Sequence, residues 1–209
     1  MLLGAGRGTR LASLGLNVPK ILVDVGGEPL LARQLRYLAR EGAERVVVNA
    51  HHLAEQVEDF AAQHTGPPEL VVVTEPELLG TAGGVRNALP LLGSEPFVVL
   101  YGDVLTDAPL APLLEAHARS GAAATLAVYE SQETEGKGTI EVDSGGRIVA
   151  FREKQAHAGE GPTLINAGLY VLNVGFVTKS VPEREVCDFG HRTFPRALEN
   201  DVLRAYRLT

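Results

Sequence analysis

Three glycines within five residues, near the start of the chain, have the composition of a turn that binds phosphate. The turn comprises Leu3, Gly4, Ala5, Gly6, Arg7, Gly8 and Thr9, and Arg10 follows it directly. Glycine lets the backbone approach a ligand closely and adopt positive φ. Successive N–H groups in such a turn form an anion-binding concavity, and a guanidinium adds a permanent, forked cation. A phosphate site is therefore predicted, with a flexible glycine turn beside a surface arginine as the alternative.

The lysine of the Pro19-Lys20 pair strengthens the prediction of a phosphate site. Lys20 stands ten residues after Arg10, so the loop between them can return it to the same pocket. Two cations that face a triphosphate offset the negative charge that develops during phosphoryl transfer. The alternative is a solvated lysine after a rigid proline, which is common in isolation.

Two other phosphate-binding motifs fit the glycine turn less well. A dinucleotide-binding fingerprint needs G-x-G-x-x-G at the start of a helix and an acidic residue about 20 positions later. Thr9 occupies the place of the third glycine, and Pro19-Lys20 interrupts the unit before Asp24. The Gly-Lys-Ser/Thr ending of a Walker A loop is absent from the sequence of this turn. A dinucleotide-dependent oxidoreductase is therefore disfavoured.

Two later segments place polar groups at the ends of strands. Asp103 follows the apolar run from Val98 to Tyr101, and ligand sites in open α/β sheets form at the carboxyl ends of strands. A carboxylate there can hold Mg²⁺, which bridges phosphate oxygens, or it can simply cap a turn. Gly80 and Thr81 follow another strand and open a helix. Small residues there leave room for a flat base, although Thr81 would also suit an ordinary helix cap.

Strands and helices that alternate along the first two thirds of the chain must position these groups. Apolar, strand-like runs cover Arg45 to Asn49, Leu70 to Thr74, Phe97 to Tyr101 and Ala123 to Tyr129. Helix-like segments cover Pro29 to Arg40, Ala54 to Gln63, Ala82 to Leu89 and Ala108 to Arg119, and Asp107 is the expected cap of the last. Nearly continuous apolar runs suit strands that are covered on both faces. The pattern predicts an α/β fold with a doubly wound, mainly parallel sheet.

The pattern changes after about residue 130. Thr139 to Val142 and Arg147 to Phe151 predict a hairpin, and Leu169 to Leu172 predicts another strand. We expect this part to form a small β lobe that packs on the same sheet, so that residues 1–209 make one domain.

Charge and composition exclude several classes of protein. The formal net charge is -7, and the basic patch that nucleic-acid binding requires is not visible. No apolar run approaches the roughly 20 residues that span a bilayer, and Met1-Leu2-Leu3 leads straight into glycine, unlike a signal peptide. The single Cys187 cannot form an internal disulfide. We expect a cytoplasmic protein that binds neither nucleic acid nor membrane.

The glycine turn and the two cations together resemble a known signature. The stretch from Gly6 to Leu11, with eight residues between Arg10 and Pro19, is similar to the motif of the sugar-1-phosphate nucleotidyltransferases, also called NDP-sugar pyrophosphorylases. The similarity extends through nearly the whole chain. It implies a Rossmann-like nucleotide-diphospho-sugar transferase fold, with a nucleotide-binding half over residues 1–130 and a sugar-binding half over residues 131–209. The implied reaction transfers a nucleotidyl group from a nucleoside triphosphate to a sugar 1-phosphate and uses Mg²⁺.

The resemblance also assigns roles to residues. The turn from Leu3 to Thr9 cradles the nucleotide, and Gly80 and Thr81 lie near its base. The catalytic groups are Arg10 on the leaving phosphates, Lys20 on the reacting phosphate, and Asp103 as a ligand of Mg²⁺. The sugar phosphate contacts Gly138, Glu153, Lys154 and Asn166. The segment from Asp188 to Pro195 resembles mannose- and heptose-1-phosphate transferases, which favours GTP; uridylyl or thymidylyl transfer to another sugar 1-phosphate is the alternative. Oligomers are frequent in such enzymes.

The chain departs from the family pattern at its carboxyl end. Relatives continue past a strand like Leu203 to Leu208 into a motif with a second aspartate for the metal, whereas Thr209 is the last residue of this sequence. The sequence could be trimmed before that motif, another carboxylate could replace that ligand, or metal binding could be weaker. A catalytically silent, regulatory subunit that binds sugar nucleotides is therefore the main competing hypothesis.

Overall fold

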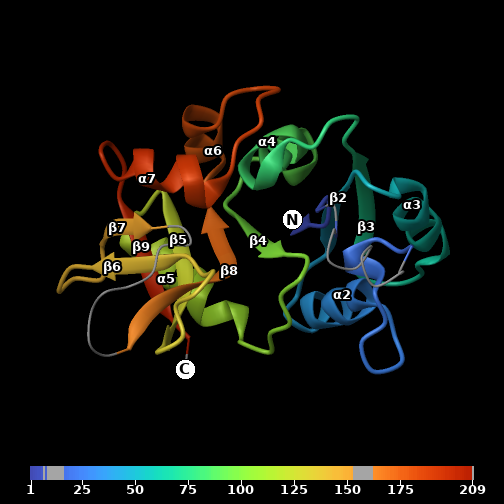
Figure 1. Ribbon diagram of the computed structural model, residues 1–209, viewed down its shortest axis with the longest axis horizontal. Helices are drawn as coiled ribbons and strands as arrows, with labels where there is room; N and C mark the ends of the chain where they lie inside the picture. The colour runs from blue at the N-terminus through green and yellow to red at the C-terminus, as the bar shows by residue number, and fades with distance from the viewer. Residues whose placement is uncertain (7, 9–16, 153–161, 209) are drawn as a thin grey trace.

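The computed structural model describes residues 1–6, 8, 17–152 and 162–208, in which a nine-stranded sheet is surrounded by helices (Figure 1). The strands are β1 (Leu2–Leu3), β2 (Arg45–Ala50), β3 (Glu69–Thr74), β4 (Phe97–Tyr101), β5 (Ala124–Ser131), β6 (Thr139–Val142), β7 (Ile148–Arg152), β8 (Thr163–Leu172) and β9 (Leu203–Arg207). The helices are η1 (Lys20–Leu22), α2 (Leu30–Arg40), α3 (Ala54–Gln63), α4 (Gly80–Leu92), α5 (Leu110–Ser120), α6 (Val174–Ser180), the π-helix η2 (Phe189–Thr193) and α7 (Phe194–Ala197). Among the helices of these residues, none combines the length and apolar character needed to span a bilayer.

The main path of the sheet has the order β3-β2-β1-β4-β8-β5-β9. The pairs β3–β2, β2–β1, β1–β4 and β5–β9 are parallel. Strand β8 runs antiparallel to both of its neighbours on this path, β4 and β5. All other strands on the path therefore point the same way, and the carboxyl ends of β1, β2, β3 and β4 share one edge. The predicted mainly parallel sheet is confirmed, with β8 as the strand that reverses direction.

Helices cover both faces of the sheet, so the fold is doubly wound as predicted. Val47 and Val99 belong to a buried cluster that includes side chains of α4 and α6. Their neighbours Val46 and Leu100 belong to a second cluster, which includes side chains of α2 and α5. Successive residues of a strand point to opposite faces, so strands covered on both sides need apolar residues at every position. This requirement explains the unbroken valine and leucine runs of β2 and β4.

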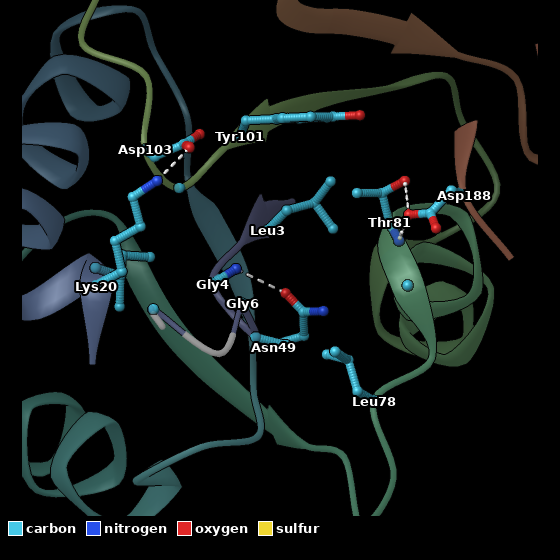
Figure 2. A pocket seen from close by; sticks show the side chains of 15 residues that line it. Leu3, Gly4, Gly6, Lys20, Asn49, Leu78, Thr81, Tyr101, Asp103 and Asp188 are labelled. Carbon is cyan, nitrogen blue, oxygen red and sulfur yellow. Dashed lines mark hydrogen bonds and ion pairs between the residues drawn. The ribbon is translucent and has the colours of Figure 1, made fainter. Parts of the chain in front are cut away.

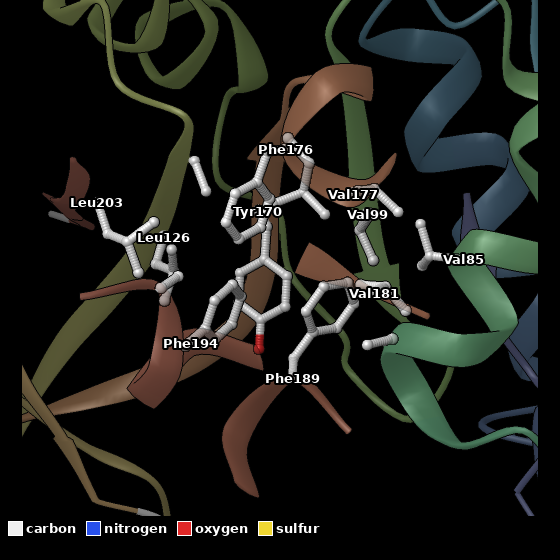
Figure 3. Packing of buried hydrophobic residues seen from close by; sticks show 14 of the residues in the cluster. Val85, Val99, Leu126, Tyr170, Phe176, Val177, Val181, Phe189, Phe194 and Leu203 are labelled. Atoms are coloured by element: carbon white, nitrogen blue, oxygen red, sulfur yellow. The ribbon is translucent and has the colours of Figure 1, made fainter. Parts of the chain in front are cut away.

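An aromatic group packs η2 and α7 against β8 (Figure 3). The ring of Tyr170 lies edge-on to Phe194 and Phe189, with centroids 5.1 and 5.7 Å away, and Phe189 stacks on Phe194 at 5.0 Å. All three side chains are completely buried. Burial of each contributes roughly 2–3 kcal/mol, so this group fixes the segment around residue 189 firmly on the sheet.

The predicted hairpin forms, with Thr139 opposite Arg152 in the β6–β7 pair. β6 also pairs with β8, so the hairpin extends the main sheet. The expected cap of α5 was wrong. That helix begins after Pro109 without a side-chain cap from a preceding residue, and the Leu110 N–H instead donates to the Glu41 carboxylate at 2.9 Å. A carboxylate 69 residues away in the sequence therefore replaces Asp107.

Candidate functional site

The glycine turn leaves strand β1 at the shared carboxyl edge of the parallel strands. The Gly4 N–H donates to the Asn49 side-chain oxygen at 2.8 Å. A Cβ atom on Gly4 would lie 2.8 Å from the Asn49 carbonyl oxygen, so a larger residue would push this backbone away from β2. The turn therefore needs glycine because two strands approach closely there. It borders a cavity of about 560 Å³, called the first cavity below, which is lined in part by Leu3, Gly4, Ala5, Gly6 and Gly8.

Lys20 and Asp103 form an ion pair across the mouth of the first cavity (Figure 2). The Lys20 Nζ lies 2.5 Å from the Asp103 Oδ2. Lys20 starts η1 directly after Pro19, and Asp103 follows β4. The two side chains are 41% and 44% exposed, so their pairing adds little to stability and both remain accessible to a ligand. The structure thus brings together a cation and a carboxylate that stand 83 residues apart in the sequence.

The turn that carries Asp103 is held in place by main-chain contacts. Gly102 N–H donates to the Leu3 carbonyl at 3.0 Å, and a Cβ atom on Gly102 would lie 2.5 Å from that oxygen. The buried Gln34 amide donates to the carbonyls of Tyr101 and Val104, at 3.1 and 2.8 Å. Gln34 thereby fixes the backbone on both sides of Asp103. Sequence analysis missed this residue, whose signal was a polar side chain on the apolar face of α2.

Thr81 lies across the first cavity from Lys20, at the start of α4 (Figure 2). Gly80, which precedes Thr81 in that helix, also lines the cavity. Gly80 has φ of 76°, and a Cβ atom there would lie 2.7 Å from the Cys187 carbonyl oxygen. Thr81 does not cap the helix through its side chain. Its N–H and hydroxyl both donate to Asp188 Oδ1 at 3.0 Å, and the hydroxyl accepts the Phe189 N–H at 2.9 Å. The start of α4 is therefore held by a segment from the far end of the chain.

A second cavity, of about 440 Å³, adjoins the first. Residues that line both cavities are Thr81, Tyr101, Asp103 and Asp188. Gly138 and Asn166 line the second cavity, and the Asn166 N–H donates to the Gly138 carbonyl at 2.9 Å. The Asn166 amide donates to the Tyr170 hydroxyl at 2.7 Å and accepts the Gly168 N–H at 3.1 Å. These bonds fix the orientation of the Asn166 side chain at the cavity wall.

Five of the predicted site residues lie outside the described residues. They are Arg7, Thr9, Arg10, Glu153 and Lys154. The other predicted residues line one of the two cavities: Leu3, Gly4, Ala5, Gly6, Gly8, Lys20, Gly80, Thr81 and Asp103 line the first, and Gly138 and Asn166 line the second. Asp188 was not among the predicted site residues, because only the folded chain brings it beside Thr81.

Within the described ranges, no group of three or more histidine, cysteine or carboxylate side chains is arranged to hold a metal. Asp103 and Asp188 supply the carboxylates that line the cavities in this part of the chain. Mg²⁺ is commonly held by one or two carboxylates together with substrate phosphates and several waters. The accessible Asp103, at the mouth of the first cavity, fits a metal that arrives with a polyphosphate.

Comparisons with known proteins give independent information on the family of this chain. A family model described as "Nucleotidyl transferase" matches residues 1–208. The mannose-1-phosphate guanylyltransferase catalytic subunit beta of Drosophila melanogaster is 34% identical over 214 residues, which is 100% of this chain and 57% of that protein. The UTP–glucose-1-phosphate uridylyltransferase of Synechocystis is 29% identical over 97% of this chain and 55% of that protein. The chain thus spans a little over half the length of these relatives.

A solved structure shows the same fold. HddC from Yersinia pseudotuberculosis matches with a TM-score of 0.85 and 24% sequence identity, over 99% of this chain and 88% of that chain. This likeness confirms the predicted α/β architecture.

Proposed function

This chain belongs to the nucleotidyl transferase family, and from that premise we propose that it transfers a nucleotidyl group from a nucleoside triphosphate to a sugar 1-phosphate. The products are an NDP-sugar and pyrophosphate. The observation that carries the proposal is the junction of two cavities at Asp103, with Lys20 paired to it at 2.5 Å. Two reactants can therefore meet at a point that holds both a cation and a carboxylate.

The first cavity suits the nucleotide, and the second suits the sugar phosphate. Backbone N–H groups of a glycine turn bind phosphate oxygens, and the small residues at the start of α4 leave space for a base. The second cavity offers the Asn166 amide and the Gly138 backbone to sugar hydroxyls. We accordingly assign the nucleotide to residues 1–130 and the sugar to residues 131–209 of one domain, with Asp188 contributing to both cavities.

The proposed step is an in-line displacement at the α-phosphorus. An oxygen of the sugar phosphate forms the new P–O bond, and the bond from the α-phosphorus to the bridging oxygen breaks. Pyrophosphate leaves with that electron pair. The attacking oxygen is already anionic, so the step needs no general base. Lys20 stabilises the charge on the reacting phosphate, and the remaining contribution is the alignment of the two reactants.

Nucleotidyltransferases of this family generally use a divalent metal. We propose Mg²⁺, held by Asp103 and by oxygens of the nucleotide phosphates. When bound, the ion neutralises phosphate charge and orients the polyphosphate. An ion held by the Asp103 carboxylate would compete with Lys20, whose Nζ lies 2.5 Å from Oδ2. Lys20 would then be available to the phosphate.

The resemblance to mannose- and heptose-1-phosphate transferases leads us to propose GTP and a sugar 1-phosphate of that type. The 34% identity to a mannose-1-phosphate guanylyltransferase supports this choice. The uridylyltransferase relative, at 29% identity, supports UTP as the alternative. We also propose a cytoplasmic location, because the reaction consumes a nucleoside triphosphate.

A pyrophosphate-release assay tests the function directly. Four common triphosphates should be combined with a panel of sugar 1-phosphates, with and without Mg²⁺. We expect release only when a triphosphate, a sugar 1-phosphate and the divalent ion are all present. A protein that binds a sugar nucleotide in calorimetry but releases no pyrophosphate from any combination would instead be the silent regulatory subunit.

A further inference from the structure

A buried carboxylate that lines neither cavity follows strand β3. Glu75 is 1% exposed and continues the β2–β3 ladder, with its N–H donating to the Ala50 carbonyl at 2.7 Å. Its own carbonyl lies 2.9 Å from His51 Nδ1, which must donate because a carbonyl oxygen can only accept. A buried carboxylate is costly unless donors surround it. The donors around Glu75 therefore indicate what this side chain is for.

The two oxygens of Glu75 connect the two elements that border the first cavity. Oε1 accepts the Asn49 Nδ2 amide at 2.7 Å, and Asn49 in turn accepts the Gly4 N–H at 2.8 Å. Oε2 accepts the Leu79 N–H at 3.1 Å, immediately before Gly80 and helix α4. This Gly4–Asn49–Glu75–Leu79 chain ties the glycine turn to the start of α4 through a single carboxylate.

The hydrogen bonds in this chain have only one possible direction. The two backbone N–H groups at its ends can only donate, so Asn49 must present its oxygen to Gly4 and its NH₂ to Glu75. Glu75 must then accept at both oxygens. Glutamine at this position has one oxygen and one NH₂ group, so one of the two contacts would set a donor against a donor.

Helix α4 is packed so closely against the side chains of Asn49 and Glu75 that no room remains for a methyl group at Gly84. A Cβ atom on Gly84 would lie 2.5 Å from Asn49 Nδ2 and 2.8 Å from Glu75 Oε1. Gly84 is buried within α4, where alanine would otherwise be the better helix former. Glycine at this position is therefore explained by the space that the two side chains occupy.

We infer that Glu75 is a positioning residue that sets the spacing between the glycine turn and the start of α4, and so the fit of the nucleotide. The inference rests on the proposed function, since it assigns the phosphates to the turn and the base to α4. It predicts that Glu75 controls nucleotide affinity without touching the nucleotide. The second cavity shares no residue with the Gly4–Asn49–Glu75–Leu79 chain, so the sugar phosphate should be unaffected.

The test is a pair of substitutions that move the carboxylate along the chain. Glu75→Gln places a donor against a donor. Asn49→Asp together with Glu75→Gln restores an acceptor for every donor and keeps the net charge of the wild-type protein. Glu69→Gln, at the start of the strand that Glu75 follows, changes an exposed glutamate paired with Arg45 and is the matched control for the Glu-to-Gln change. Nucleotide Kd by calorimetry, KM for each substrate and the thermal unfolding midpoint are measured for the wild type, for these three variants and for Gly84→Ala.

We expect Glu75→Gln to raise the nucleotide Kd and KM about tenfold, the factor that corresponds to one unmatched buried donor. KM for the sugar 1-phosphate should stay within about twofold, since that substrate binds in the other cavity. The double variant should recover part of the nucleotide affinity, because the carboxylate that it introduces at position 49 also lines the first cavity, and Glu69→Gln should behave as wild type. Gly84→Ala should reproduce the nucleotide defect of Glu75→Gln by steric displacement.

Three results would overturn the inference. The first is an unchanged nucleotide Kd in Glu75→Gln. The second is a double variant that binds nucleotide no better than Glu75→Gln. The third is a loss in which KM for both substrates rises together with a fall in the unfolding midpoint, as expected for a purely structural role. A wild-type protein that binds no nucleotide at all would overturn the proposed function and this inference together.

Discussion

The first cavity lies at the ends of parallel strands, whereas the second is lined in large part by the antiparallel strand β8 and by residues 136–138, which precede β6. In the first cavity, glycine backbone is pressed against neighbouring strands, and Gln34, Asn49 and Glu75 fix it through buried hydrogen bonds. In the second, the side-chain contacts of Asn166 are local, because they reach Gly168 and Tyr170, two and four residues away. The comparison points to a strict geometry at the proposed nucleotide cavity and a more adjustable one at the proposed sugar cavity.

The largest effect is expected at the point where the two cavities meet. Lys20→Met removes the cation that we propose faces the reacting phosphate, and loss of one such electrostatic contact typically lowers kcat about 10²- to 10³-fold. Steady-state pyrophosphate release measures the change. Lys179→Met, which removes an exposed lysine paired with Asp201, serves as the control and should leave kcat unchanged. Equal kcat values for Lys20→Met and wild type would refute the assigned role.

Two positive-φ glycines, one on each cavity, compare the strictness of the two geometries. Gly80→Ala combines φ of 76° with a contact of 2.7 Å to the Cys187 carbonyl, whereas Gly136→Ala has φ of 69° and open space around it. We expect Gly80→Ala to lower the free energy of unfolding by about 3 kcal/mol and Gly136→Ala by about 1 kcal/mol. Denaturant unfolding of both variants measures the difference, and equal losses would contradict the comparison.

Asp188 lines both cavities, so its substitution should affect both substrates. Asp188→Asn keeps an oxygen for the Thr81 N–H and hydroxyl but removes the charge that strengthens those bonds. We expect KM for the triphosphate and for the sugar 1-phosphate each to rise about fivefold, which corresponds to roughly 1 kcal/mol. If only one of the two KM values changed, Asp188 would belong to a single cavity.

The smallest effect is expected in the second cavity. Asn166→Asp keeps the acceptor for the Gly168 N–H and replaces the NH₂ group that donates to the Tyr170 hydroxyl with an oxygen. The added negative charge would face the proposed sugar phosphate. KM for the sugar 1-phosphate should therefore rise about threefold through screened repulsion. KM for the triphosphate should not change. A rise in the triphosphate KM alone would place Asn166 with the nucleotide.

The sequence predicts the strands and the glycine turns, because the fold requires particular residue types at those positions. Apolar runs located β2, β3 and β4, and the glycines of the first turn and of Gly102-Asp103 marked where strands end beside a ligand cavity. Asn166 was found only through a family resemblance, because its own bonds are short-range and common. The glycine predictions succeeded because their backbone positions have a steric requirement that only glycine meets.

The supporting polar residues could not be predicted in the same way. Gln34 binds carbonyls 67 and 70 residues away, and Thr81 binds Asp188 at a separation of 107 residues. Their partners are main-chain groups or single side chains, which leave no spacing rule in the sequence. A glutamine on an apolar helix face and a glutamate directly after an apolar strand were visible signals, but each is also compatible with a solvated side chain.

The β4–β8 ladder has a consequence for how the reactants could be aligned. β4 leads into Asp103 and β8 carries Asn166, and the two strands are paired from Phe97 opposite Leu172 to Leu100 opposite Leu169. Sliding one cavity past the other would break this ladder. The distance between the proposed nucleotide site and the proposed sugar-phosphate site is therefore fixed by strand register when the chain folds. Any closure over the substrates would have to come from the surrounding loops rather than from a hinge between the cavities.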